Sequence, residues 1–247
     1  MKQKFLLFLL IAFTAISCNT NSSTSTESTE ETPPKESTPP SSTAKLPFDI
    51  HRFDEAIAAF QKEDHEQGIR KGEILFTGSS SIRFWVTLKE DMEGLAVLNR
   101  GFGGSTLPEA VHYADQIIFP YEPEIIVLYS GENDISEGRT PQEAFDSFKE
   151  LTAQITAKLP NTKLFYLCMK PSIARWEMWP KMEDANKLFA DYLAEQPNME
   201  YVDISAPMLD ESGEPKKDIF VEDMLHMNEK GYAAWTKIVK PLLVAAK

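Results

Sequence analysis

Short runs of consecutive apolar residues alternate along the chain with longer segments whose apolar residues recur every three or four positions. The runs lie at residues 73–77, 96–99, 124–130, 163–169 and 199–204, whereas segment 141–159 typifies the longer spacing. A continuous apolar run is typical of a strand buried on both faces, and the wider spacing is typical of an amphipathic helix. The alternation predicts an α/β fold with βαβ units, hence a mostly parallel sheet covered by helices on both faces.

The amount of apolar sequence fits one domain. The chain has 247 residues, of which 42% are hydrophobic, and residues 46–247 contain no internal repeat and no second linker. A length of about 200 residues suits a single core. Segments 49–64 and 228–246 have helical spacing with aromatic residues on one face, which predicts two packing helices at the ends of this domain.

Charge and cysteine content exclude several classes of protein. The formal net charge of −13 disfavours a general nucleic-acid binder, because phosphate-rich partners would be repelled. Two cysteines cannot form a disulfide framework, and Cys168 lies in an apolar run, which predicts a buried core residue rather than a thiol catalyst. No metal or organic cofactor is expected, because the histidines are scattered and none has zinc-ligand spacing: His51, His65, His112 and His226.

The start of the chain resembles an export signal. Residues 1–17 combine a basic start, an apolar stretch and a small residue, and this stretch is too short to span about 30 Å of hydrocarbon. The sequence Ala-Ile-Ser-Cys at 15–18 resembles a bacterial lipobox, although Ala15 departs from the usual leucine. We therefore expect a signal peptide over 1–17, lipidation of Cys18, and an exported lipoprotein whose membrane partner is reached through this anchor.

A polar segment separates the lipobox from the domain. Of the 27 residues from Asn19 to Lys45, 18 are Ser, Thr or Pro. Such a composition lacks the apolar surface needed to fold, so we expect a disordered linker over 18–45. A flexible chain of this length would hold the domain on average roughly 30 Å from its anchor. An O-glycosylated stalk in a secreted protein is the alternative, and both interpretations place the protein outside the cytoplasm.

Four polar motifs follow the predicted strands, where ligands are expected outside the carboxyl ends of a parallel sheet. They are Gly-Ser-Ser-Ser at 78–81, a glycine-rich loop at 99–106, Gly-Glu-Asn-Asp at 131–134 and Asp-Met-Leu-His at 223–226. Each has an ordinary structural interpretation, such as a helix cap or a turn. Each also has a chemical one: a serine nucleophile, backbone N–H groups facing an anion, an amide donor, and a carboxylate that orients a histidine base.

One other pair competes with the last motif. Glu109 and His112 are also three residues apart, but they fall inside the predicted helix after the glycine loop, where an exposed ion pair is the usual explanation. We therefore favour Asp223 and His226. The remaining histidines flank the first predicted helix and are expected on the surface.

The four motifs in this order resemble the SGNH or GDSL family of serine hydrolases, over roughly residues 72–247. The resemblance implies a three-layer, flavodoxin-like α/β/α sandwich with five strands. It also implies that Ser80 is the nucleophile, that Asp223 and His226 complete the triad, and that Ser80, Gly104 and Asn133 form the oxyanion hole. The family's acidic residue before the nucleophile is Ser79 here, which leaves Ser79 and Ser81 as alternative nucleophiles.

The resemblance further implies an esterase whose acyl group is short. The loop at 99–106 is most similar to platelet-activating-factor acetylhydrolases and carbohydrate acetylesterases, so we expect acetyl esters, with a glycan or a small molecule as the substrate. Arg175 and Trp176, after the fourth predicted strand, are predicted to contact it, an ordinary packed loop being the alternative. Two other functions stay open: a lipolytic acylhydrolase or lysophospholipase, and a non-catalytic glycan-binding module on a hydrolase scaffold.

Overall fold

The computed structural model of the protein describes residues 49–247. The predicted signal segment 1–17, the lipidated Cys18 and the linker 18–45 lie outside the described residues, as does the predicted domain start at residue 46. These four predictions therefore stay predictions. Within the described residues, no helix is both long enough and apolar enough to cross a membrane.

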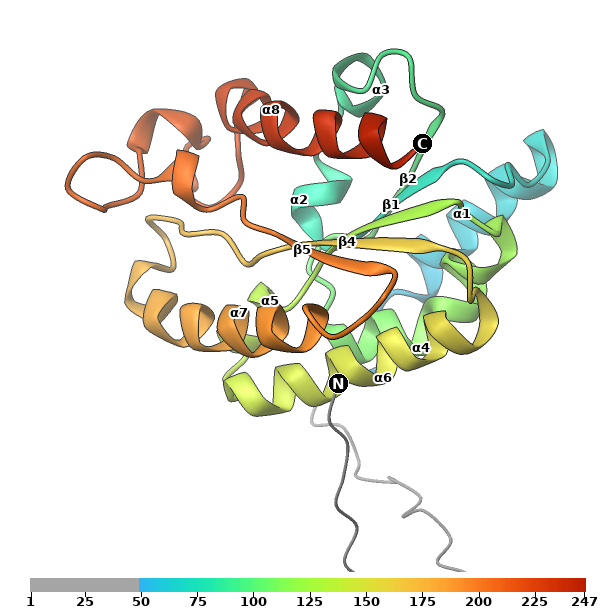
Figure 1. Cartoon of the computed structure of the whole chain (residues 1–247), viewed down its shortest axis with the longest axis horizontal. Helices are drawn as coiled ribbons and strands as arrows, with labels where there is room; N and C mark the ends of the chain where they lie inside the picture. Colours follow the sequence, from blue (N-terminus) through green and yellow to red (C-terminus); the bar gives the residue numbers. More distant parts are fainter. Residues whose placement is uncertain (1–48) are drawn as a thin grey trace, which may run out of the picture. The chain divides into compact units, whose positions relative to one another are not determined.

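A five-stranded parallel sheet lies at the centre of the described chain (Figure 1). Its spatial order is β2-β1-β3-β4-β5, and every pairing between neighbours is parallel. This confirms the predicted α/β class and the flavodoxin-like sheet, and each strand overlaps one of the predicted apolar runs. The strands are β1 (Ile74–Gly78), β2 (Val97–Gly101), β3 (Ile125–Tyr129), β4 (Lys163–Leu167) and β5 (Met199–Val202).

The strand order reverses at β1, and this determines where a ligand can bind. β1 pairs with β2 on one side and with β3 on the other, so Gly78 at its end lies in register with both Gly101 and Tyr129. The chain leaves these strands towards opposite faces of the sheet, which opens a crevice at their carboxyl ends. The loops after β1, β2 and β3 therefore meet at one place.

Helices cover both faces of the sheet (Figure 1). One face packs against α1 (Asp54–Gln67), α4 (Leu107–Ile117), α6 (Pro141–Lys158) and α7 (Trp179–Leu193), and the other against α2 (Ser80–Arg83), α3 (Leu88–Asp91) and α8 (Glu229–Ala246). The short α5 (Glu132–Ser136) follows β3. Single 3₁₀ turns lie at η1 (Phe119–Tyr121), η2 (Trp176–Met178), η3 (Ala206–Met208) and η4 (Lys217–Ile219).

Local signals determine where the long helices begin. At α6, the Thr140 side chain accepts a hydrogen bond from the Glu143 N–H, the Glu143 carboxylate returns the contact, and Pro141 occupies the first helical position. At α8, the Asn228 side chain accepts from the N–H groups of Lys230 and Gly231. This second cap, two residues after His226, fixes the start of α8 at Glu229.

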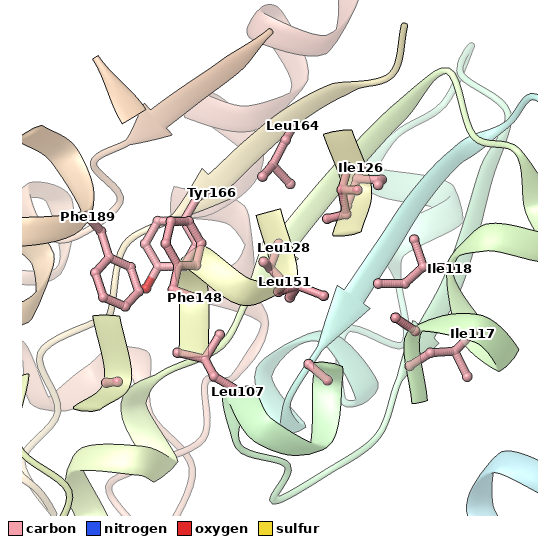
Figure 2. Packing of buried hydrophobic residues seen from close by; sticks show 14 of the residues in the cluster. Leu107, Ile117, Ile118, Ile126, Leu128, Phe148, Leu151, Leu164, Tyr166 and Phe189 are labelled. Atoms are coloured by element: carbon pink, nitrogen blue, oxygen red, sulfur yellow. The ribbon is translucent and has the colours of Figure 1, made fainter. Parts of the chain in front are cut away.

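The larger apolar core lies between the sheet and the helices α4, α6 and α7. Figure 2 shows its aromatic centre, where Phe148 of α6, Phe189 of α7 and Tyr166 of β4 converge. The rings of Phe148 and Phe189 are stacked with centroids 4.3 Å apart. Burial of side chains of this size contributes about 2–3 kcal/mol each, so the core holds the sheet and its loops rigidly beneath the site.

Both boundaries of the first helix differ from the prediction. The first helix was expected over residues 49–64 but runs from Asp54 to Gln67, because the Asp49 carboxylate accepts the His51 N–H and stabilises a turn instead. The helix ends at Gln67, and the next residue, Gly68, has φ +86°. The surface positions of His51 and His65 and the burial of Cys168 are confirmed.

Candidate functional site

The loop after β1 positions Ser80 at the crevice. Gly78 ends the strand with φ +120°, and a Cβ at this position would lie 1.9 Å from the Tyr129 carbonyl oxygen. A glycine is therefore required, and the tight turn that it permits leads directly into α2. Ser80 is the first residue of that helix, so its backbone N–H has no partner within the helix.

Ser80, His226 and Asp223 form a continuous chain of hydrogen bonds. The Oγ of Ser80 lies 2.9 Å from Nε2 of His226, and Nδ1 of His226 lies 2.6 Å from Oδ2 of Asp223. The structure therefore brings together the three residues that the sequence motifs singled out, although 143 positions separate Ser80 from Asp223 in the chain. Ser79 and Ser81 are both buried, and Ser80 alone of the three bonds the imidazole.

A tight turn holds Asp223 and His226 in place. Oδ1 of Asp223 accepts hydrogen bonds from the backbone N–H groups of Leu225 at 2.9 Å and of His226 at 2.8 Å. Met224, which directly follows Asp223, adopts φ +56° in this turn. Desolvation raises the pKa of Asp223, but the hydrogen bonds from the His226 side chain and from these N–H groups outweigh it and lower the pKa to about 2. The carboxylate is therefore charged at neutral pH. It can fix the tautomer of the imidazole and stabilise its positive form.

The glycine loop after β2 lies beside Ser80. A Cβ on Gly103 would be 3.6 Å from Cβ of Ser80, and Gly104 adopts φ +86°. The Gly104 carbonyl accepts a hydrogen bond from Nη2 of Arg52 at 3.3 Å, and the same nitrogen lies 2.9 Å from the Glu109 carboxylate. Arg52 therefore ties this loop to the start of α4.

This contact corrects one expectation. Glu109 was expected to form an exposed pair with His112, but its side chain is fully buried. The Glu109 carboxylate instead accepts hydrogen bonds from Arg52 and from the N–H and hydroxyl groups of Thr106, as in a capping box. The sequence spacing suggested a surface ion pair, but the arginine that neutralises this carboxylate lies 57 positions earlier in the chain. The preference for Asp223 and His226 over this pair is consistent with that burial.

Asn133 lies in α5, directly after β3, with its side-chain amide fixed at both ends. Its Nδ2 donates to the Ser105 carbonyl at 2.9 Å, and its Oδ1 accepts from Nη2 of Arg175 at 3.0 Å. A guanidinium can only donate and a carbonyl can only accept, so both partners require the same orientation of the amide. The second hydrogen on Nδ2 is not used by Ser105, which leaves one amide donor for a ligand.

Buried charges support Asn133 from behind. Glu132 accepts from Nζ of Lys170 at 2.8 Å, from Nη1 of Arg175 at 2.8 Å and from the hydroxyl of Tyr129. Burial raises the pKa of Glu132, but the two cations outweigh it and hold that pKa below its usual value. Burial lowers the pKa of Lys170, and Glu132 opposes this effect. The cluster therefore contains one carboxylate between two cations, and Arg175 connects it to the Asn133 amide.

The next residue anchors the same helix to α4. Asp134 is fully buried, and its carboxyl accepts the N–H of Leu107 at 3.0 Å. Burial raises the pKa of Asp134 to about 7, although this hydrogen bond and the charge of Arg139 lower it. The Asp134 carboxyl therefore keeps its proton to a higher pH than an exposed aspartic acid does.

The two predicted substrate contacts have protein partners in this structure. Arg175 bonds Glu132 and Asn133, as described above, and 17% of its side chain is exposed. The ring of Trp176 stacks on that of Trp179 with an interplanar angle of 13° and packs partly against the larger core. The Ala174 N–H donates to the Met224 carbonyl at 3.0 Å, so this loop borders the turn that carries Asp223 and His226. Substrate contact by the two side chains stays a prediction.

Motif reasoning placed the segment 170–176 at the site, but it did not single out Arg52 or Glu132, and it did not predict the pairing of Lys170 with Glu132. Glu132 belongs to the Gly-Glu-Asn-Asp motif, and Lys170 directly follows the fourth apolar run, but nothing local marks either as half of a buried pair. Arg52 precedes the first helix and contacts residues more than fifty positions away. Among residues 49–247, no three His, Cys, Asp or Glu side chains come together in a way that could hold a metal ion.

Comparison with known families identifies the class of protein. The profile of the GDSL-like Lipase/Acylhydrolase family matches residues 76–234, more than half of the chain and the whole region between β1 and α8. Together with the parallel sheet and the polar residues at its carboxyl edge, this match defines a carboxylic ester hydrolase. The chain belongs to the GDSL-like lipase/acylhydrolase family, which is the family that its four motifs resemble. No curated protein matches the chain in sequence.

Solved structures of low sequence identity share the fold. A Streptococcus pneumonia protein named for platelet activating factor is 21% identical, with 78% of this chain and 94% of that chain covered and a TM-score of 0.70. A carbohydrate esterase family 3 structure from Talaromyces cellulolyticus is 17% identical, with 71% and 97% covered and a TM-score of 0.55. A variant of an acetyl-xylooligosaccharide esterase from Geobacillus Stearmophilus is 15% identical, with 69% and 93% covered and a TM-score of 0.55.

Proposed function

We propose that this protein is an exported serine esterase that removes short acyl groups, chiefly acetyl, from carbohydrate esters. The observation that carries the proposal is the unbroken Ser80–His226–Asp223 hydrogen-bond chain, with distances of 2.9 Å and 2.6 Å, at the carboxyl edge of the sheet. This is the geometry that a serine nucleophile and its general base require. It also counts against a glycan-binding module without catalysis, since binding alone needs no such chain.

In the proposed reaction, Nε2 of His226 takes the proton from Ser80 as Oγ attacks the ester carbonyl. The C–O bond to the alcohol then breaks, the alcohol leaves with the proton from His226, and an acyl-enzyme forms on Ser80. Water, deprotonated by the same imidazole, attacks this acyl group and releases the carboxylic acid and the free serine. Asp223 stays ionised throughout and stabilises the positive imidazolium.

Three donors are assigned to the oxyanion: the backbone N–H groups of Ser80 and Gly104, and the side-chain amide of Asn133. The first helical position of Ser80, the left-handed backbone of Gly104 and the free Nδ2 hydrogen of Asn133 support this assignment. Each donor in such a site contributes about 10²–10³ in rate. We expect Asn133→Ala to lower kcat by that factor with little change in KM.

Acetyl and carbohydrate specificity rest on the resemblance and on two similar folds. One solved structure is a carbohydrate esterase and another is a variant of an acetyl-xylooligosaccharide esterase, and both cover about 70% of this chain. Fold similarity at such low identity does not transfer a substrate by itself.

A specific observation favours one alternative, a lipolytic acylhydrolase. A cavity of about 520 Å³ beside the site is lined by Phe84, Val86 and Val221, three exposed apolar side chains. The Phe84 ring also contacts the His226 imidazole edge-on, with centroids 4.9 Å apart. A long acyl chain could lie in this cavity, so chain-length preference distinguishes the two functions.

The test is hydrolysis of p-nitrophenyl esters from acetyl to octanoyl by the purified protein, with Ser80→Ala as the control. Highest kcat/KM on acetate, lost in Ser80→Ala, supports the acetylesterase, and release of acetate from acetylated xylo-oligosaccharides would extend this to carbohydrate. Highest kcat/KM on octanoate would favour the lipolytic alternative. Activity that survives in both Ser80→Ala and His226→Ala would contradict the serine mechanism.

We also propose that the enzyme is anchored in the bacterial cell envelope by a lipid on Cys18. The support is the sequence of the export signal and of the Ser/Thr/Pro-rich segment 18–45. Mass spectrometry of the membrane fraction would find Cys18 as the acylated first residue of the mature chain. Cys18→Ala would move the protein out of this fraction, and an unmodified Cys18 in the membrane-free fraction of wild type would contradict the proposal.

A further inference from the structure

A basic cavity borders the site on the β2 side of the sheet. It has a volume of about 510 Å³ and is lined by α1, the edge strand β2 and the segment from α2 to α3. Four basic side chains and one acidic side chain line it: Arg70, Arg83, Lys89, Arg100 and Glu63. The whole chain has 25 basic and 38 acidic residues, so the cavity has the opposite charge balance.

Two of these cations are engaged by carboxylates of the protein. Arg100 is 2% exposed and pairs with Asp64 at 2.7 Å and with Glu63 at 3.2 Å. Arg70 lies 3.6 Å from the Glu73 carboxylate. Because Glu63 already pairs with Arg100, the acidic side chain of the cavity does not neutralise the remaining cations.

Arg83 and Lys89 are different. Both are exposed, and no carboxylate of residues 49–247 lies within 4.0 Å of either charged group. The interaction that the structure gives Arg83 is with the Phe84 ring, at 6.0 Å from its centroid. An unpaired guanidinium at the rim of a cavity is suited to bind a carboxylate or a phosphate with two parallel hydrogen bonds.

Arg83 also lies close to the nucleophile. It follows Ser80 by three positions in α2, so both side chains project from the same side of the helix. Nη1 of Arg83 and Cβ of Ser80 each lie 3.6 Å from the point that a Cβ on Gly103 would occupy. The distance between the Arg83 nitrogen and the Ser80 carbon is therefore at most twice this value. An ester bound at Ser80 is therefore within reach of this guanidinium.

We propose that Arg83, with the basic cavity beside it, binds an anionic group on the alcohol portion of the substrate. The inference rests on the proposed acetylesterase function, because an acetyl group is too small to reach the cavity and the anion must then belong to the alcohol. The favoured substrates are acetyl esters of alcohols that carry a carboxylate or a phosphate close to the ester. An acidic sugar supplies the first group, and a phosphorylated glycerol supplies the second.

The experiment compares matched charged and neutral substrates. Acetate release would be measured from acetylated glucuronic acid against acetylated glucose, and from acetylated glycerol 3-phosphate against acetylated glycerol. We expect a ratio of kcat/KM, charged over neutral, of about ten in at least one pair. This ratio should fall at high ionic strength, because salt screens an exposed charge. The pair that shows the preference identifies the source of the anion.

Variants of the full chain assign the preference to Arg83. Arg83→Gln should lower the ratio to near one, whereas Arg83→Lys, which keeps the charge but loses the planar fork, should retain part of it. Lys187→Gln, an exposed lysine of α7, removes the same formal charge from another element and should keep the wild-type ratio. Thermal unfolding would verify that each variant is folded.

Three results would overturn the inference. They are ratios near one in wild type for both pairs, a preference that persists in Arg83→Gln, or an equal loss of kcat/KM on charged and neutral substrates in Arg83→Gln.

A second experiment applies if none of the four esters is hydrolysed. It measures the inhibition of p-nitrophenyl acetate hydrolysis by free glucuronate and by glycerol 3-phosphate. Stronger inhibition of wild type than of Arg83→Gln supports the site, and equal inhibition contradicts it. Ser80→Ala separates the two proposals, because activity that survives this change overturns the serine mechanism whatever the ratio.

Discussion

The Arg175 guanidinium donates to Oδ1 of Asn133 at 3.0 Å while it pairs with Glu132 at 2.8 Å, so one side chain connects a buried charge cluster to a proposed oxyanion donor. Arg175 was expected to contact substrate. The geometry gives it a positioning role as well, because the guanidinium fixes which end of the Asn133 amide faces the site. These two roles lead to different kinetic results.

Replacement of Arg175 tests the positioning role. We expect Arg175→Ala to lower kcat by about tenfold with little change in KM, because an amide that is free to rotate donates less well in the transition state. Arg175→Lys should restore part of kcat, since a lysine can still donate to Oδ1. The measurement is steady-state kinetics on p-nitrophenyl acetate, with circular dichroism to verify folding. A rise in KM at constant kcat would instead assign Arg175 to substrate binding.

Asp223→Asn tests the role of the carboxylate. The asparagine keeps the size of the side chain but favours the wrong tautomer of His226, so we expect kcat to fall by about 10³–10⁴. The low pKa of Asp223 means that its carboxylate is lost only in strong acid, where the hydrogen bonds that lower this pKa break. At mildly acidic pH the Asp223 carboxylate therefore stays ionised. A kcat for Asp223→Asn within threefold of wild type would remove Asp223 from the triad.

The motifs could be predicted from the sequence because each one is local. Ser80 and Asn133 follow strands, and His226 precedes a helix, that hydrophobic spacing identifies. The parallel topology then requires the loops after β1 and β3 to meet. The supporting contacts could not be predicted in this way. The burial of Lys170 and the pairing of Glu109 with Arg52 depend on residues 38 and 57 positions away, which only tertiary packing brings together.

Gly78→Ala tests the turn that presents Ser80. The added Cβ would lie 1.9 Å from the Tyr129 carbonyl oxygen, and the alanine would have to adopt the positive φ of +120° that glycine has here. We therefore expect a loss of stability of about 3 kcal/mol or more and a loss of activity. The matched control is Gly68→Ala. Gly68 has φ +86° but no atom within 4 Å of the added Cβ, so we expect about 1 kcal/mol from backbone strain alone.

Urea denaturation of both glycine variants measures this difference. Equal losses of stability would show that the backbone conformation, and not the contact with Tyr129, makes Gly78 necessary. Full activity in a stable Gly78→Ala would contradict the role of this turn in positioning Ser80.

The buried Asp134 predicts how stability depends on pH. Its pKa is raised to about 7 in the folded chain, from an ordinary value of 3.8, so between these values the native state holds a proton that the unfolded state has released. Stability from this group is therefore present at low pH and is lost as pH rises towards and beyond 7. The full effect corresponds to up to about 4 kcal/mol between pH 4 and pH 8.

The variant Asp134→Asn isolates this contribution, because asparagine keeps the shape and an acceptor for the Leu107 N–H but has no proton to release. The difference in free energy of unfolding between Asp134→Asn and wild type, measured by urea denaturation, should shift in favour of the variant as pH rises from 5 to 8. Other carboxyl groups titrate alike in both proteins and cancel in this difference. A difference that is constant over this range would mean that Asp134 is ionised in the folded protein at pH 5, with Arg139 and the N–H of Leu107 sufficient to stabilise its charge.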